Sequence, residues 1–180
     1  MAGRRTDTRE RIQRVALELF AEQGYEGSSL REIAERLNVT KAALYYHFRT
    51  KEDIVSSLLE DWGTALDDLL ARETSPAELL TAYAGLVEDR FGPVMGLVQR
   101  NTSALKAIAA GAGLADRMLR LHERLCGGAT DPEADLRARL ALVAVQLNSA
   151  EGGPGTPPAI ALAVALDVLS PGRSTTGTGT

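Results

Sequence analysis

The sequence predicts an all-α protein in which a small three-helix head is joined by one long helix to a larger helical body. Apolar residues recur at helical spacing through most of the 180 residues, and helix-capping signals precede several of these segments. Five of the eight aromatic residues lie before residue 49. Residues 1–51 carry ten Lys or Arg against seven Asp or Glu, whereas the remainder carries ten against 17. We therefore expect a basic head over 1–52, an acidic body over 53–170 and a disordered tail over 171–180.

Composition also limits the class of protein. A hydrophobic fraction of 44% suits a globular core, and no segment approaches the roughly 18 uninterrupted apolar residues of a membrane span. The N-terminal segment MAGRRTDTRERIQ lacks the apolar region of a secretory signal. Cys126 is the single cysteine, which excludes an intramolecular disulfide framework and suits a reducing compartment. These observations predict a soluble, cytoplasmic protein with no membrane partner.

The first helix of the head is predicted to begin at a cap supplied by Asp7 or Thr8. Gly24 is expected to end it in a left-handed conformation. The residues spaced for its buried face are Ile12, Val15, Ala16, Leu19 and Phe20.

Two short helices follow, separated by a turn of only two residues, Asn38 and Val39. Ser29 and Glu32 have the spacing of a capping box, and Thr40 can cap the helix after the turn. The inward residues of the two helices are expected to be Leu30, Ile33, Ala34, Leu37, Leu44 and Phe48. Two helices that cross steeply at a short turn are typical of a helix-turn-helix, which places its second helix in the major groove of DNA.

The outward face of the second short helix has the chemistry that DNA recognition requires. Ala42 and Ala43 are small enough to let the backbone approach base edges and thymine methyl groups. Tyr45 and Tyr46 combine an apolar ring with a hydroxyl, and Lys41 stands at the helix start, where it can meet a phosphate.

Each of these residues also has an ordinary structural explanation. Two adjacent tyrosines often belong to a core, a lone histidine such as His47 often packs, and Lys41 and Lys51 can be solvated. The caps, the turn and the exposed face agree with one another, however, and this joint pattern favours DNA binding.

Residues 9–55 resemble the DNA-binding domain of the TetR family of bacterial transcriptional regulators. The resemblance is carried by AEQGYEGSSLREIAERLNVTKAALYYHFRTKEDI, above all by LYYHF with Lys51 after two intervening residues, and it covers about a quarter of the chain. It implies that Ala42 is the small residue at the second position of the recognition helix. Ser28-Ser29 stands where threonines are common in the family and keeps a hydroxyl for a phosphate. The residues predicted to contact DNA are Ser29, Thr40, Lys41, Ala42, Tyr45, Tyr46, His47 and Lys51.

The body is predicted to consist of helices alone. Thr50 caps a long helix to about residue 72, and Ser75-Pro76 with Glu78 restarts the chain as a helix to about residue 90. Gly92-Pro93 is expected to interrupt it, with two or three shorter helices over 93–125. A helix from Pro132 is expected to turn an inner stripe of Leu136, Leu140, Val143 and Leu147 toward the core.

The last helix, over 158–169, is apolar nearly all round and must be covered on most sides. It is either buried within a monomer or, as we expect, part of a homodimer. In the homodimer, helices 132–150 and 158–169 of two subunits form a four-helix bundle. Major-groove readers usually bind two half-sites as dimers, and the family resemblance implies the same arrangement.

The family resemblance also implies a small-molecule pocket inside the body. The candidate ligand-binding residues are Trp62, Tyr83, Phe91, Met95, Met118 and His122. Because no aromatic residue follows Phe91, later helices would supply an aliphatic wall, which favours an apolar effector.

No catalytic or metal-binding constellation is present in the sequence. It contains no GxSxG, no phosphate-binding glycine loop and no HExxH. His122 and Cys126 have a spacing that can bind metal, but a third ligand is missing and a packing pair explains them better. We expect neither enzymatic activity nor a cofactor or metal.

The sequence therefore predicts a sequence-specific transcriptional regulator that binds a palindromic operator in double-stranded DNA. The leading hypothesis is a repressor that a small-molecule effector releases from its operator. The alternative is a DNA-binding regulator without a small ligand, controlled by a protein partner or by its abundance. An enzyme fused to a DNA-binding head and a helical interaction module with a degenerate head are further alternatives.

Overall fold

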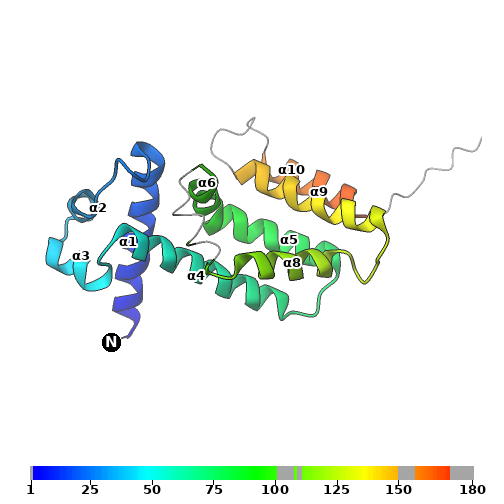
Figure 1. Cartoon of the computed structure of the whole chain (residues 1–180), viewed down its shortest axis with the longest axis horizontal. Helices are drawn as coiled ribbons and strands as arrows, with labels where there is room; N and C mark the ends of the chain where they lie inside the picture. Colours follow the sequence, from blue (N-terminus) through cyan, green and yellow to red (C-terminus); the bar gives the residue numbers. More distant parts are fainter. Residues whose placement is uncertain (1, 101–107, 109–110, 150–156, 171–180) are drawn as a thin grey trace, which may run out of the picture.

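A computed structural model describes residues 2–100, 108, 111–149 and 157–170, and every regular element in these ranges is helical (Figure 1). The head contains α1 (Ala2–Gln23), α2 (Leu30–Arg36) and α3 (Lys41–His47), and α4 (Lys51–Leu70) runs from it into the body. The body contains α5 (Pro76–Leu86), the π-helical turn η1 (Val87–Phe91), α6 (Gly92–Arg100), α8 (Leu114–Leu125), α9 (Pro132–Ser149) and α10 (Pro158–Leu169). The all-α prediction is confirmed.

The head packs largely as its periodicity predicts. Ile12, Ala16, Leu19 and Phe20 of α1 are buried, and Leu30, Ile33 and Ala34 of α2 are buried against them. The predicted start of α1 is wrong, because the helix begins at Ala2 rather than after Asp7 or Thr8. The segment from Arg4 to Arg11 contains no glycine or proline, so nothing stops the helix from extending toward the N-terminus.

The turns of the head depend on two residues with left-handed backbone. Gly24 has a φ of 79° and ends α1 as predicted, and Asn38 has a φ of 54° in the turn between α2 and α3. Thr40 then caps α3 by accepting a hydrogen bond from the Ala43 amide at 3.2 Å. The helix-turn-helix is therefore specified by residues close together in sequence.

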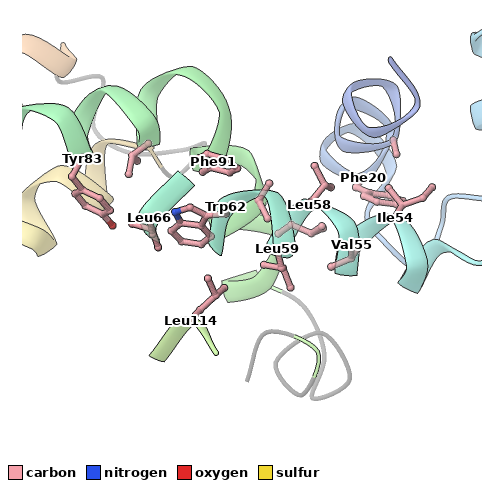
Figure 2. Packing of buried hydrophobic residues seen from close by; sticks show 14 of the residues in the cluster. Phe20, Ile54, Val55, Leu58, Leu59, Trp62, Leu66, Tyr83, Phe91 and Leu114 are labelled. Atoms are coloured by element: carbon pink, nitrogen blue, oxygen red, sulfur yellow. The ribbon is translucent and has the colours of Figure 1, made fainter. Parts of the chain in front are cut away.

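Helix α4 connects the head to the body as one continuous element. It begins at a capping box formed by Thr50 and Asp53. Its buried side chains form a row from Ile54 beside the head to Trp62 and Leu66 in the body (Figure 2). The helix continues through Gly63, which lies against the Arg117 guanidinium of α8. A Cβ at this position would come within 3.1 Å of the Arg117 side chain. Arg117 also donates two hydrogen bonds, of 2.8 and 2.9 Å, to Asp67 Oδ2.

The expected interruption at Gly92-Pro93 is absent. The chain instead passes through a single π-helical turn, η1, in which the Gly92 amide bonds to the Val87 carbonyl five residues earlier. Proline lacks an amide hydrogen and crowds the preceding turn, and a wider turn just before it absorbs this conflict without ending the helix. Helices α5 and α6 therefore follow one another without a loop.

The predicted inner stripe of α9 is also wrong. Helices α9 and α10 lie side by side, and α9 buries its small residues Ala138 and Ala141 together with Leu142 and Val145. The larger apolar residues of the two helices are exposed instead. We call them the α9/α10 apolar face: Leu136, Leu140, Val143 and Leu147 of α9, and Ile160 and Val164 of α10. Small residues let two helices approach closely, so the bulky stripe turns away from α10.

Candidate DNA-binding surface

Helix α3 is anchored on one side and exposed on the other. Leu44 and the following Phe48 are 1% and 2% exposed, whereas Tyr45 and Tyr46 are 40% and 68% exposed. Lys41 and Ala42 are exposed as well, and His47 is half-buried. The tyrosines therefore belong to the surface of the head and not to its core, as the sequence predicted.

The exposed side chains of α3 form a compact cationic and aromatic patch. The Lys41 ammonium lies 5.2 Å from the centre of the Tyr45 ring, and the Tyr46 and His47 rings make an edge-on contact at 5.3 Å. A cation over an aromatic face stays available to a phosphate while the ring restricts its movement. This arrangement suits a surface that pairs phosphate contacts with readout of base edges.

Two of the predicted contact residues act as helix caps. Ser29 Oγ accepts a hydrogen bond from the Glu32 amide and donates one of 2.7 Å to Glu32 Oε2. Thr40 accepts from Ala43, as described above. The neighbouring Ser28 is buried and donates to the Gly24 carbonyl at 2.6 Å. These hydroxyls shape the helix-turn-helix, and a phosphate contact by Ser29 or Thr40 stays a prediction.

Lys51, which the sequence predicts as a DNA contact, makes hydrogen bonds within the head. Its ammonium donates to the carbonyls of Tyr25 at 2.5 Å and Ser28 at 2.8 Å, and lies 4.5 Å from the centre of the Tyr25 ring. These contacts fasten the start of α4 to the loop between α1 and α2. In the free protein Lys51 therefore anchors α4 to this loop. A phosphate contact by Lys51 stays a prediction.

Replacing Lys51 by methionine is expected to lower the free energy of unfolding by about 2 kcal/mol, because charge-assisted hydrogen bonds to two carbonyls are lost. The control is Lys41→Met, which removes an exposed lysine and should leave stability unchanged while reducing the salt dependence of DNA binding by about one unit. Urea unfolding and DNA titrations over a salt series measure both effects. If Lys51→Met keeps full stability and lowers the salt slope instead, Lys51 is a phosphate contact.

The sequence did not identify two arginines beside the recognition helix. Arg9 of α1 lies over the Phe48 ring, 5.0 Å from its centre. Together with Arg49 and His47 it lines a polar groove of about 330 Å³ next to α3. Arg9 is far from α3 in sequence. Its position three residues before the buried Ile12 was the one sequence feature that indicated a place beside α3.

Three of the predicted ligand-binding residues form part of the packed core of the body. Trp62 and Tyr83 are fully buried, and Phe91 stacks on Trp62 with ring centres 5.7 Å apart (Figure 2). Burial raises the pKa of the Tyr83 phenol, whose oxygen accepts a hydrogen bond of 3.0 Å from Gln146 of α9. Gln146 is half-buried, and nothing in the sequence indicated this contact.

The other predicted ligand-binding residues are less central. The Met118 sulfur lies 3.9 Å from the Tyr83 oxygen, and His122 Nε2 lies 3.2 Å from Asp135 Oδ1 on α9. The side chain of Met95 lies outside the described residues. The structure thus brings Trp62, Phe91, Tyr83 and Met118 into one part of the body, whereas His122 joins α8 to α9 at the surface.

Two further classes of site were tested on the described residues. Within these ranges, no three His, Cys, Asp or Glu side chains are grouped so that they could hold a metal ion. His122 and Cys126 are a pair only, with 3.8 Å between Nε2 and Sγ. Among the helices described, none has the length and apolar character needed to cross a membrane.

A helix-turn-helix with an exposed aromatic and basic recognition helix, carried on a helical body, defines a DNA-binding regulatory protein. Comparison with known families agrees, because residues 12–58 match the family described as bacterial regulatory proteins, tetR family. The match covers the head and the first part of α4, so the head is a DNA-binding domain of the TetR kind.

Curated relatives are similar to the head and the start of the body. The transcriptional regulator AcrR of Shigella flexneri is 46% identical over 54 residues, which cover 30% of this chain and 25% of that protein. The negative regulator IcaR of the Staphylococcus epidermidis biofilm operon is 40% identical over 57 residues, 32% of this chain and 31% of that protein. The matched segment thus spans between a quarter and a third of the length of these relatives.

Solved structures extend the similarity of fold to the body. A transcriptional regulator from Aquifex aeolicus VF5 superposes with a TM-score of 0.73 at 24% identity, covering 90% of this chain and 97% of that one. The regulator FadR from Bacillus subtilis, solved in complex with stearoyl-CoA, superposes with a TM-score of 0.66 at 18% identity, covering 89% and 96%. At these identities the likeness concerns the fold alone.

Proposed function

We propose that this protein is a cytoplasmic, dimeric transcriptional repressor, not an enzyme, that binds a palindromic operator and leaves it when a small apolar effector binds the body. The observation that carries the proposal is the exposed face of α3. The two tyrosines beside Lys41 are exposed on a helix that Leu44 and Phe48 anchor to the head. In the major groove this face would meet base edges and phosphates.

The α9/α10 apolar face supports the dimer. Its six large side chains are 46–64% exposed, and they lie on two helices that already pack against each other. Exposed apolar patches of this kind mark interaction surfaces, and a second copy of the same two helices would complete a four-helix bundle. Two heads in one dimer would then contact two half-sites of a palindrome.

Negative regulation and an effector are supported by the relatives. IcaR is described as a negative regulator, and FadR binds stearoyl-CoA in its crystal structure. In this chain, α4 begins in the head and carries Trp62 in its body half, so a molecule that displaces Trp62 also displaces α4. The alternative of a regulator without a small ligand is favoured by one observation, the complete burial of Trp62 and Tyr83.

Replacing Tyr46 by alanine is expected to weaken operator binding by about 1–3 kcal/mol, because a base or phosphate contact at the groove is lost. Tyr46→Phe separates the ring from the hydroxyl: full affinity assigns the contact to the ring, and a loss equal to that of alanine assigns it to the hydroxyl. The measurement is a titration of DNA from upstream of the gene, beside an unrelated duplex, over a salt series. A Tyr46→Ala protein that folds and binds its operator with unchanged affinity contradicts the proposed role of α3.

The effector is tested separately from DNA binding. Addition of the effector is expected to lower operator affinity and to change the distance between spin labels placed on the two heads. If operator binding is specific but no apolar compound in a broad panel changes the stability of the protein or its affinity for DNA, the regulator without a small ligand is the correct alternative.

A further inference from the structure

A cleft separates the head from the body on one side of α4. It has a volume of about 430 Å³, which lies in the range of small-molecule sites. Helix α1 forms one wall, η1 and the start of α6 form the other, and α4 contributes Leu58 and Asp61. Its apolar surface is supplied by Leu17 and Ala21 of α1, Leu58 of α4, Phe91 of η1 and Pro93 of α6. We call this the head–body cleft.

The polar groups around the head–body cleft are mostly acidic. Among the described residues, Glu10, Glu18, Asp61 and Asp89 line it together with the Arg14 guanidinium. Glu18 and Asp89 are exposed. An excess of carboxylates over cations in this lining creates a negative potential that attracts organic cations and repels DNA phosphates. Apolar walls in the same cleft favour a cation that also carries apolar groups.

One polar contact in this region is buried and joins the two structural units. The Gln13 amide of α1 donates to Ser57 Oγ at 3.0 Å and to Asp61 Oδ2 at 2.7 Å, both on α4. Gln13 and Ser57 are almost fully buried. The contact fixes α1 on α4 at the base of the head–body cleft, so a molecule bound there touches both the head and the body.

We propose that the head–body cleft binds a small organic cation with apolar groups, and that this binding changes the affinity of the protein for DNA. The regulatory half of the proposal rests on the proposed DNA-binding function, whereas the binding half does not. Phe91 lines the cleft and stacks on Trp62, which is the single tryptophan of the chain. Its fluorescence therefore reports on events one side chain away.

The test uses two ions of the same shape and opposite charge, tetraphenylphosphonium and tetraphenylborate, in potassium-free buffer. Tetraphenylphosphonium is expected to change Trp62 fluorescence with saturation, and calorimetry should give the same affinity, while tetraphenylborate binds at least tenfold more weakly. The double variant Glu18→Gln with Asp89→Asn should lose about tenfold in affinity for the cation. The control, Asp68→Asn with Glu123→Gln, removes two exposed carboxylates outside the cleft and should lose less than twofold.

Equal binding of the two ions, or unchanged cation affinity in the Glu18→Gln, Asp89→Asn variant, overturns the site. For the regulatory half, saturating tetraphenylphosphonium is expected to shift the operator Kd at least threefold in the parent protein and not in the variant. An unshifted Kd with intact cation binding overturns that half. Operator binding without the cation is measured in the same titration, so a failure of DNA binding itself is recognised separately.

Discussion

A variant with glutamate at Leu140 and at Ile160 is expected to be a monomer that binds its operator at least about 100-fold more weakly than the parent protein. The two positions lie on different helices of the α9/α10 apolar face, and both side chains are about half exposed. In a symmetric bundle each substitution appears twice, so four carboxylates would meet in a desolvated interface. Loss of the dimer removes the advantage of two linked half-site contacts.

Analytical ultracentrifugation and an operator titration measure the two parts of this result. Leu119→Glu is the matched control, because Leu119 is an equally exposed leucine on α8 away from the α9/α10 apolar face. It should leave both the dimer and the affinity unchanged. A Leu140→Glu, Ile160→Glu protein that is folded and still dimeric would show that the subunits meet elsewhere.

Replacement of Trp62 by alanine is expected to lower the free energy of unfolding by about 3–5 kcal/mol, the usual cost of truncating a fully buried large aromatic residue. Trp62 is 1% exposed, stacks on Phe91 and lies between Phe91 and Leu114 (Figure 2). The surrounding helices come from three separate stretches of the chain, so the cavity cannot be closed by one local adjustment.

Trp62→Phe is the informative companion variant. In the described part of the chain the buried Trp62 Nε1 has no hydrogen-bond partner, so phenylalanine removes an unsatisfied donor while keeping a ring against Phe91. We expect it to lose less than half of the free energy that alanine loses. Urea unfolding followed by circular dichroism gives both values, since the fluorophore itself is removed. A loss below about 1 kcal/mol for Trp62→Ala would mean that the body repacks around this position.

The head could be predicted from the sequence because its signals are local. Capping pairs such as Ser29 with Glu32, the glycine at position 24 and the spacing of Leu44 and Phe48 each act within a few residues. The hydrogen bonds by which Lys51 anchors α4 could not be predicted, for the opposite reason. Its partners, the carbonyls of Tyr25 and Ser28, are more than 20 residues away in sequence and carry no side-chain signature.

The body was less predictable because its helices carry more than one apolar face that could be buried. Apolar spacing in α9 marks both the bulky stripe with Leu140 and the small stripe with Ala138 and Ala141, and only the position of α10 decides which is buried. Pro93 indicated a break, but the π-helical turn before it kept the helix continuous. Trp62 and Phe91, two of the candidate ligand-binding residues, stack on each other, and their role in binding a ligand stays a prediction.

Helix α4 is fastened at both ends to different parts of the molecule. Gln13 holds its N-terminal half to α1, while on α8 Arg117 bonds to Asp67 and Arg124 bonds to the carbonyls of Leu70 and Arg72. A tilt of α4 at its contacts with α8 would therefore displace the head at the other end of the helix. Its 20 residues make it about 30 Å long, so a tilt of about 5° at α8 moves the head by about 2.6 Å. In a symmetric dimer the two displacements add to a change of about 5 Å in the separation of the heads. This change is large compared with the spacing of about 34 Å between half-sites.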